Sequence, residues 1–408
     1  MSDQRGTVET EKIIAVHHKH LMNTYNRYPM VIVRGKGVKV WDANGKEYLD
    51  FLGGIAVNPI GHCPSAVIDA MLCQAQELMH CSNLYYSKPS ADLAELLSSN
   101  GGLDKIFFCN SGAEANEGAI KLARKYQWRN GYKDKHKIVT ATHSFHGRTL
   151  GALAATAKPE IQEGFGPLPA GFAHIEWNDP EDLASKINDT TAAVLIEPIQ
   201  GEGGVHCASI DFLQELRRIC NLTGALLIFD EIQCGMGRCG TLFAYESFEI
   251  KPDIITLAKG IASGMPLGAI CATSAVAEAF QPGDHGTTFG GNPVAAAAAL
   301  ATLKILIEEK YPEKAALKGA YLVEKLRLLQ EDYPHTIAEI RGKGLMVGVE
   351  LKIDGKALLD QCHAHGLLVN ITAGNVLRLL PAYTITEEEI DQAVDIIRLA
   401  LRDNHGNT

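Results

Sequence analysis

Three segments of the chain carry side chains that suit one organic cofactor. One apolar, strand-like run ends at Asp230 and a second ends at Lys259, while Ser111-Gly112-Ala113 lies between a strand-like run and a long helical pattern. A lysine amine can form a Schiff base with an aldehyde, and a carboxylate can pair with a pyridine nitrogen. The N-terminus of a helix can bind a phosphate. Together these groups predict a site for pyridoxal 5'-phosphate.

The chemistry of this cofactor assigns a role to each segment. Lys259 would hold the cofactor as a Schiff base and, once the substrate displaces it, act as a base toward the substrate carbon. Asp230 would keep the pyridine nitrogen protonated, which makes the ring an electron sink. The backbone N–H groups of Gly112 and Ala113 and the Ser111 hydroxyl would bind the phosphate.

Two further residues are expected to contact the cofactor. Phe145 can lie against the ring face, and Gln233 can donate to the phenolic oxygen of the ring. Taken singly, Asp230 is more often a turn or cap residue, Ser111-Gly112 an N-cap and Phe145 a core residue. Their combination and order favour the cofactor site.

A second motif points to another class of enzyme. Residues 235–240 fit G-x-G-x-x-G, the pattern that binds dinucleotides when it opens a helix directly after a strand. Here four residues separate it from the preceding strand, and the residues after it do not begin a helix. A nicotinamide-dependent dehydrogenase is therefore the alternative from another class, beside a non-catalytic binding protein. No metal is expected, because the His-rich stretch 362–365 lies on a helical pattern.

Composition favours a cytoplasmic enzyme. The chain has 408 residues and a net charge of -10, which disfavours nucleic-acid and anionic membrane surfaces. Its ten cysteines include no Cys-x-x-Cys pair and lie mostly in apolar runs, so reduced thiols are expected. The first residues carry no secretory signal, and no apolar run reaches membrane-spanning length.

The hydrophobic pattern predicts an α/β fold. Between residues 61 and 300, short apolar runs alternate with helical patterns, as in a mostly parallel sheet covered on both faces. We expect a large cofactor-binding domain at 61–304 and a small α+β domain at 305–408, with the N-terminal segment 1–60 packing on the small domain. Ligands gather at the carboxyl ends of such strands, where Glu197, Asp230 and Lys259 follow apolar runs.

The chain resembles the class III aminotransferases. The resemblance rests on residues 197–204, 229–238, 252–260 and 285–293 and extends from about Tyr25 to Leu401. It implies the fold-type I architecture of pyridoxal phosphate enzymes and a homodimer whose active sites lie at the subunit interface. It also implies that Thr288 contacts the cofactor phosphate of the neighbouring subunit.

Within this family, residues 23–29, 51–58, 80–86 and 145–148 resemble those of the enzymes that act on N2-acetyl-L-ornithine. The resemblance implies that Arg148 binds the α-carboxylate of the substrate through its guanidinium fork. Glu202 and Arg378 would form a switch that lets one site accept an ω-amino donor and then glutamate or 2-oxoglutarate. Tyr25 and Glu197, which lie in matching stretches, are the other expected substrate contacts.

The resemblance implies transfer of the δ-amino group of N-acetylornithine to 2-oxoglutarate, a step of arginine biosynthesis. Ile55 stands where ornithine aminotransferases usually carry a tyrosine, and its small apolar side chain leaves room for an acylated α-nitrogen. Ornithine, succinylornithine, succinyldiaminopimelate and 4-aminobutyrate are the alternative donors on the same fold. A decarboxylase or aminomutase is disfavoured, because Arg148, Glu202 and Arg378 suit two alternating carboxylated substrates.

Overall fold

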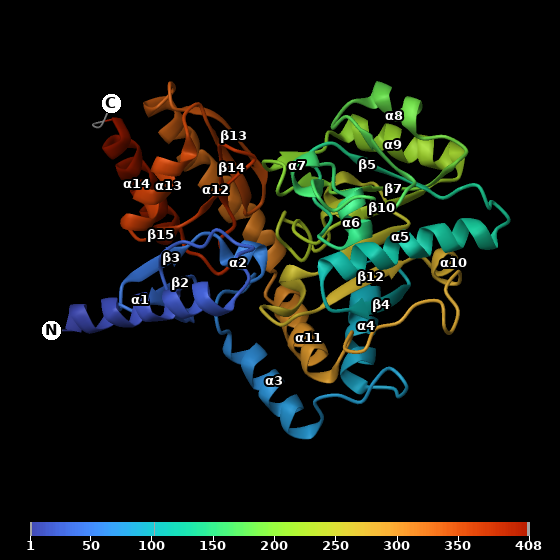
Figure 1. Cartoon of the computed structure of the whole chain (residues 1–408), viewed down its shortest axis with the longest axis horizontal. Helices are drawn as coiled ribbons and strands as arrows, with labels where there is room; N and C mark the ends of the chain where they lie inside the picture. The colour runs from blue at the N-terminus through green and yellow to red at the C-terminus, as the bar shows by residue number, and fades with distance from the viewer. Residues whose placement is uncertain (1, 102, 406–408) are drawn as a thin grey trace.

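A computed structural model of the protein describes residues 2–101 and 103–405 and centres on a seven-stranded sheet (Figure 1). Strand β12 runs antiparallel to both of its neighbours, and the other adjacent pairs are parallel. The prediction of a mostly parallel sheet is therefore confirmed. In spatial order the strands are β4 (Lys105–Cys109), β12 (Gly268–Ala272), β11 (Ile254–Leu257), β10 (Leu226–Asp230), β7 (Thr191–Ile196), β5 (Lys137–Ala141) and β6 (Phe172–Ile175).

Both faces of this sheet are buried. In β10, Leu226 and Ile228 join the hydrophobic cluster under helix α5 (Gly112–Arg129), whereas Leu227 and Phe229 join the cluster on the opposite face. Successive side chains of a strand point to opposite faces, so a strand covered on both sides is apolar throughout. The other helices of this region are α4 (Lys88–Gly101), α6 (Leu150–Ala155), α7 (Pro159–Gln162), α8 (Pro180–Lys186), α9 (Ile210–Thr223), α10 (Ser274–Ala277) and α11 (Pro293–Glu308).

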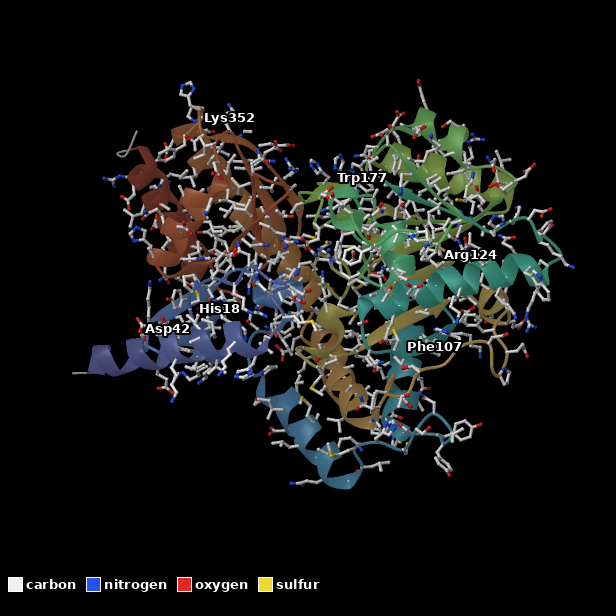
Figure 2. The ribbon with its side chains drawn as sticks, in the orientation of Figure 1. His18, Asp42, Phe107, Arg124, Trp177 and Lys352 are labelled. Atoms are coloured by element: carbon white, nitrogen blue, oxygen red, sulfur yellow. The ribbon has the colours of Figure 1, made fainter. Side chains whose placement is uncertain are left out.

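A second, antiparallel sheet lies in the C-terminal part of the chain (Figure 2). Its order is β13 (Ile337–Lys343), β14 (Met346–Leu351), β17 (Val376–Leu379) and β16 (Asn370–Thr372). The adjoining helices are α12 (Tyr311–Asp332), α13 (Gly355–Ala364) and α14 (Glu387–His405). Figure 2 places Lys352, next to β14, in this region, and Trp177 and Phe107 in the region of the large sheet.

The N-terminal strands join the C-terminal region through a third sheet. β3 (Glu47–Asp50) pairs in parallel with β15 (Leu367–Leu368), and the rest of the sheet is β1 (Ile32–Lys36) and β2 (Lys39–Asp42). Helices α1 (Ser2–His20), α2 (Gly53–Ala56) and α3 (Ser65–Glu77) complete the N-terminal part. Domain boundaries at residues 60 and 304 stay a prediction. Across residues 2–101 and 103–405, none of the helices combines the length and the apolar character needed to cross a bilayer.

Candidate active site

Five strands of the large sheet bring predicted site residues to one edge. β4, β5, β7, β10 and β11 run in the same direction, because β12 reverses direction between β4 and β11. Their carboxyl ends therefore lie at one edge of the sheet. The residues that follow them there are Ser111, Phe145, Glu197, Asp230 (the last residue of β10) and Lys259.

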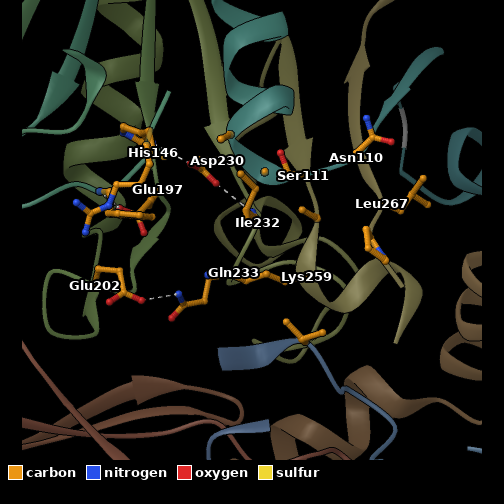
Figure 3. Close-up of a pocket in the computed structure, with 18 of the residues that line it drawn as sticks. Asn110, Ser111, His146, Glu197, Glu202, Asp230, Ile232, Gln233, Lys259 and Leu267 are labelled. Carbon is orange, nitrogen blue, oxygen red and sulfur yellow. Dashed lines mark hydrogen bonds and ion pairs between the residues drawn. The ribbon is translucent and has the colours of Figure 1, made fainter. Parts of the chain in front are cut away.

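A cavity of about 450 Å³ opens at this edge (Figure 3). Ten of the predicted site residues line it: Ser111, Gly112, Ala113, Phe145, Arg148, Glu197, Glu202, Asp230, Gln233 and Lys259. The loop 264–267, which leads into the antiparallel strand β12, supplies part of the opposite wall. The structure thus brings most of the predicted cofactor and substrate contacts into one enclosure.

The N-terminus of helix α5 faces this cavity. Ser111 caps the helix, since its hydroxyl accepts the Glu114 N–H at 3.2 Å. The first bond within the helix runs from the Ala115 N–H to the Ser111 carbonyl at 3.0 Å. The N–H groups of Gly112 and Ala113 precede that bond, so they are available to a ligand. The positive end of an 18-residue helix is suited to an anion such as a phosphate.

Asp230 is a buried carboxylate held by three donors. Its Oδ2 accepts hydrogen bonds from Asn116 Nδ2 and His146 Nδ1, each at 2.8 Å, and its Oδ1 accepts the Ile232 N–H at 3.1 Å. Figure 3 shows Asp230 between His146 and Ile232. Asn116 is fixed in turn, because its Oδ1 accepts the Thr256 hydroxyl at 2.8 Å. This network fixes the orientation of the carboxylate in the cavity wall.

Sequence reasoning assigned no role to Asn116 or His146. His146 adjoins Phe145 in the loop after β5, where a polar residue after a strand end is a weak signal of a site. Asn116 lies one turn into α5 and is fully buried. A helical asparagine carries no signal of this kind, because its sequence position does not reveal which strand it faces.

Lys259 follows β11 directly and begins the short 3-10 helix η2 (Lys259–Ala262). Its backbone is left-handed, with φ of 45°, a conformation that costs a non-glycine residue about 1–3 kcal/mol and that clusters at functional sites. Burial lowers the pKa of the Lys259 amine, although Glu202 and Asp230 act in the opposite direction. A depressed pKa favours the neutral amine, which is the nucleophilic form.

Glu202 and Arg378 form an ion pair at the side of the cavity. Arg378 Nη1 donates to Glu202 Oε1 at 2.5 Å and to Gln233 Oε1 at 3.1 Å. Arg378 comes from β17 and is fully buried, so this pair joins the C-terminal sheet to the cavity. Burial acts to raise the pKa of the Glu202 carboxyl, but the Arg378 guanidinium outweighs it and holds that pKa below its ordinary value.

The second terminal nitrogen of the same guanidinium is an unsatisfied donor. Arg378 Nη2 is buried and has no hydrogen-bond partner among the described residues. A buried donor without a partner is costly, and a substrate carboxylate would satisfy it. The predicted carboxylate-binding role of Arg378 is chemically consistent with this arrangement.

Glu197 connects two loops of the site. Its Oε1 accepts the Phe145 N–H at 3.0 Å and its Oε2 accepts the Gly201 N–H at 2.9 Å. Burial, and then the negative charge of Asp230, raise the pKa of Glu197 to about 7. Glu197 therefore connects the loop that carries Phe145 to the turn that carries Glu202, and its role as a substrate contact stays a prediction.

Three predicted site residues do not line this cavity: Arg378, which adjoins it through Glu202, and Tyr25 and Thr288. Tyr25 and Thr288 are exposed, and neither lines the cavity. Arg148 lines it, with its guanidinium carbon 5.6 Å from the centre of the Phe145 ring. Ile55, the residue used to favour an acylated donor, does not line the cavity of the single chain, whereas Val57 does.

The donor set of the cavity fits pyridoxal phosphate. An amine with a lowered pKa, a triply hydrogen-bonded carboxylate and the free N–H groups of a helix N-terminus all line one space. These are the three groups that the aldehyde, the pyridine nitrogen and the phosphate of the cofactor require. By contrast, residues 235–240 run through turns after β10 and do not open a helix there, unlike a dinucleotide fingerprint.

Comparison with known proteins gives full-length matches. Residues 21–401 match the family model for aminotransferase class-III. The acetylornithine aminotransferase of Methanocaldococcus jannaschii is 48% identical over 387 residues, which are 95% of this chain and 97% of that protein. The acetylornithine aminotransferase of Caldanaerobacter subterraneus is 48% identical over 386 residues, covering 94% of this chain and 98% of that protein.

Solved structures with the same fold include enzymes with two different substrates in their names. The ornithine aminotransferase from Toxoplasma gondii superposes with a TM-score of 0.94 at 33% identity, covering 98% of this chain and 96% of that one. The acetylornithine aminotransferase from Elizabethkingia anophelis superposes with a TM-score of 0.87 at 34% identity, covering 97% of this chain and 99% of that one.

Proposed function

The chain belongs to the class-III aminotransferases, and we propose that it transfers the δ-amino group of N-acetylornithine to 2-oxoglutarate, in arginine biosynthesis. Family membership excludes the dehydrogenase and the non-catalytic binding protein as functions of this chain. The cofactor of the family is pyridoxal phosphate, which, when bound, withdraws electrons from the carbon that carries the reacting amine.

The proposal gives each cofactor contact a defined task. Lys259 would attach the cofactor and then, as a free amine, take the proton from the substrate carbon. Asp230, oriented by Asn116 and His146, would keep a positive charge on the pyridine nitrogen. The remaining contacts, all of which line the cavity, would hold the cofactor in place: Ser111, Gly112 and Ala113 at the phosphate, Phe145 on the ring face and Gln233 at the phenolic oxygen.

The observation that carries the choice of reaction is the Glu202–Arg378 pair at the cavity that contains Lys259. An ω-amino donor presents no carboxylate near its reacting carbon, whereas glutamate presents its α-carboxylate there. An unpaired, buried arginine would repel the amine of the first substrate, and Glu202 neutralises it. Once Glu202 is displaced, Arg378 would bind the α-carboxylate of glutamate. Arg148 would bind the carboxylate at the end of either substrate that lies away from the reacting carbon.

Support for N-acetylornithine as the donor comes from the relatives. The two proteins described above, at 48% identity over nearly the whole chain, are named acetylornithine aminotransferases. The ornithine aminotransferase structure is more distant in sequence, at 33% identity. Ornithine, succinylornithine, succinyldiaminopimelate and 4-aminobutyrate are the competing donors that an experiment must rank.

We further propose a cytoplasmic homodimer in which Thr288 reaches the neighbouring site. Exposed apolar side chains gather on and after α3, which extends away from the large sheet in Figure 1. Asn83 Nδ2 donates to the carbonyls of Thr287 and Gly290, each at 3.2 Å, so the segment around Thr288 adjoins this surface. The exposed apolar residues are Ile68, Leu72, Leu78, Met79, Leu84, Tyr85, Tyr86 and Phe289. A surface of this kind is typical of an interface between subunits.

The direct test is to measure kcat/KM for the five donors with 2-oxoglutarate as the acceptor. We expect N-acetylornithine to exceed ornithine by about a hundredfold, which corresponds to about 2.7 kcal/mol of transition-state preference. Borohydride should fix the cofactor on the peptide that contains Lys259. A larger kcat/KM for ornithine or 4-aminobutyrate would keep the family but refute the proposed donor.

A further inference from the structure

A second cavity of about 460 Å³ lies on the other side of Glu202. Its walls include Lys158, His206 and Arg341, with Glu160 and Glu350 as the other acidic residues. Among the residues that the structure describes, Glu202 is the only one that lines both this cavity and the candidate active site. Glu202 therefore stands between two spaces.

The backbone that carries Glu202 is fixed on several sides. Glu202 lies in the turn between the short strands β8 (Ile199–Gln200) and β9 (His206–Cys207), as Figure 3 shows for the loop below Glu197. Its carbonyl accepts hydrogen bonds from Lys158 Nζ and from Thr372 Oγ1, each at 2.9 Å. The next fixed point is Gly204, whose carbonyl accepts Arg341 Nε at 2.9 Å. Movement of the carboxylate away from Arg378 must then come from rotation of the Glu202 side chain.

A carboxylate that leaves Arg378 needs another cation. Removing one partner from a buried ion pair is strongly destabilising unless the freed charge is compensated. In the second cavity, Arg341 is already paired with Glu339 at 2.6 Å and also with Glu350. Burial, with the nearby Arg341 charge, lowers the pKa of His206, which keeps that ring neutral.

Lys158 and Arg341 are the lysine and arginine side chains that line this cavity, and only Arg341 is paired with a carboxylate among the described residues. The Lys158 ammonium donates to the backbone carbonyl of Glu202. Because that carbonyl belongs to the same residue, the rotating carboxylate of Glu202 stays within a side chain's length of the ammonium. The second cavity provides the space for this rotation.

We propose that Lys158 is a positioning residue that receives the Glu202 carboxylate when a dicarboxylate substrate occupies Arg378. The inference rests on the proposed function, since it concerns the half-reaction with glutamate or 2-oxoglutarate. With the amine donor bound, Glu202 pairs with Arg378, and Lys158 holds only the backbone. Lys158 therefore contributes to one half-reaction and not to the other.

The test compares the two half-reactions of the holoenzyme in Lys158→Met. The glutamate half-reaction should slow by about fivefold, the size expected for loss of a partly exposed ion pair, with the N-acetylornithine half-reaction unchanged within about twofold. The Kd of glutarate, an unreactive dicarboxylate, should rise by a similar factor in calorimetry. Lys158→Arg should restore both values. Lys318→Met is the matched control, since Lys318 Nζ also donates to a carbonyl, that of Tyr383 at 2.8 Å.

A double variant separates a switch from a structural contact. In Glu202→Ala there is no carboxylate to receive, so adding Lys158→Met should leave the Kd of glutarate unchanged. Equal losses in both half-reactions, or a further loss in the double variant, would overturn the proposal. If Lys158→Met does not fold, the Kd of glutarate is measured for Lys158→Gln. A Kd equal to that of the wild type would overturn the proposal. A wild-type enzyme that reacts with glutamate but not with N-acetylornithine would instead refute the proposed donor, and the glutarate result would still test Lys158.

Discussion

Replacing Asn116 with aspartate puts a second carboxylate against Asp230. Asn116 is fully buried, and its Nδ2 donates at 2.8 Å to Asp230 Oδ2 and at 2.8 Å to the His146 carbonyl. Asparagine and aspartate have almost the same shape, so Asn116→Asp changes the charge with little change in packing. An oxygen that cannot donate would then face two acceptors.

The magnitude follows from the geometry. With oxygens 2.8 Å apart, the two charge centres lie about 4 Å apart, which at an effective dielectric constant of about 20 gives about 4 kcal/mol of repulsion. That energy raises the pKa of the introduced carboxyl in the folded state by about three units, from about 4 to about 7. A raised pKa means that the folded state holds the proton longer than the unfolded state does. The Asn116→Asp variant therefore loses stability as the pH rises from about 4 to about 7. Above about pH 7 its stability no longer falls for this reason.

The assay is urea unfolding of the cofactor-free protein at pH 5.5 and pH 8.0, at one fixed protein concentration. We expect the difference in unfolding free energy between wild type and Asn116→Asp to widen by about 2 kcal/mol between these pH values. Asn130→Asp is the control, because Asn130 is exposed and bonds only to the carbonyl of its own helix, and its difference should not change. A constant difference for Asn116→Asp would refute the reasoning that this amide hydrogen bonds to a charged Asp230.

The cofactor site was largely predictable because it depends on chain direction. Ser111, Asp230 and Lys259 each follow a strand-like apolar run, and in a parallel sheet all such positions meet at one edge. The structure confirms this edge, including the reversal at β12 that keeps β4 aligned with the other strands. The helix N-terminus at Gly112 follows from a capping serine between a strand and a helix.

The residues that orient this site were not predictable in the same way. Asn116 reaches Asp230 because of how α5 packs across the sheet, and His146 reaches it from the loop after β5. No local sequence pattern encodes either contact. Ile55 does not line the cavity of the single chain, and its role in donor selection stays a prediction. Residues 53–56 all have φ between 55° and 65°, which makes a left-handed turn. Gly53 and Gly54 adopt this conformation at little conformational cost because glycine has no Cβ. Val57, the residue after this turn, lines the cavity.

Two further substitutions test the proposed roles of the cavity residues. Lys259→Ala should fold normally and lose at least about a hundredfold in turnover, because the free amine is the general base, and borohydride should no longer fix the cofactor to the chain. Substantial residual turnover would contradict the role of Lys259 as the general base. Glu202→Gln should lower kcat/KM for N-acetylornithine by about tenfold to a hundredfold, since a buried guanidinium would then face the donor amine without a carboxylate beside it. Its half-reaction with glutamate should change by less than about threefold, because that substrate supplies its own carboxylate to Arg378. Equal losses with both substrates would show that Glu202 stabilises the cavity as a whole and does not discriminate between its two occupants.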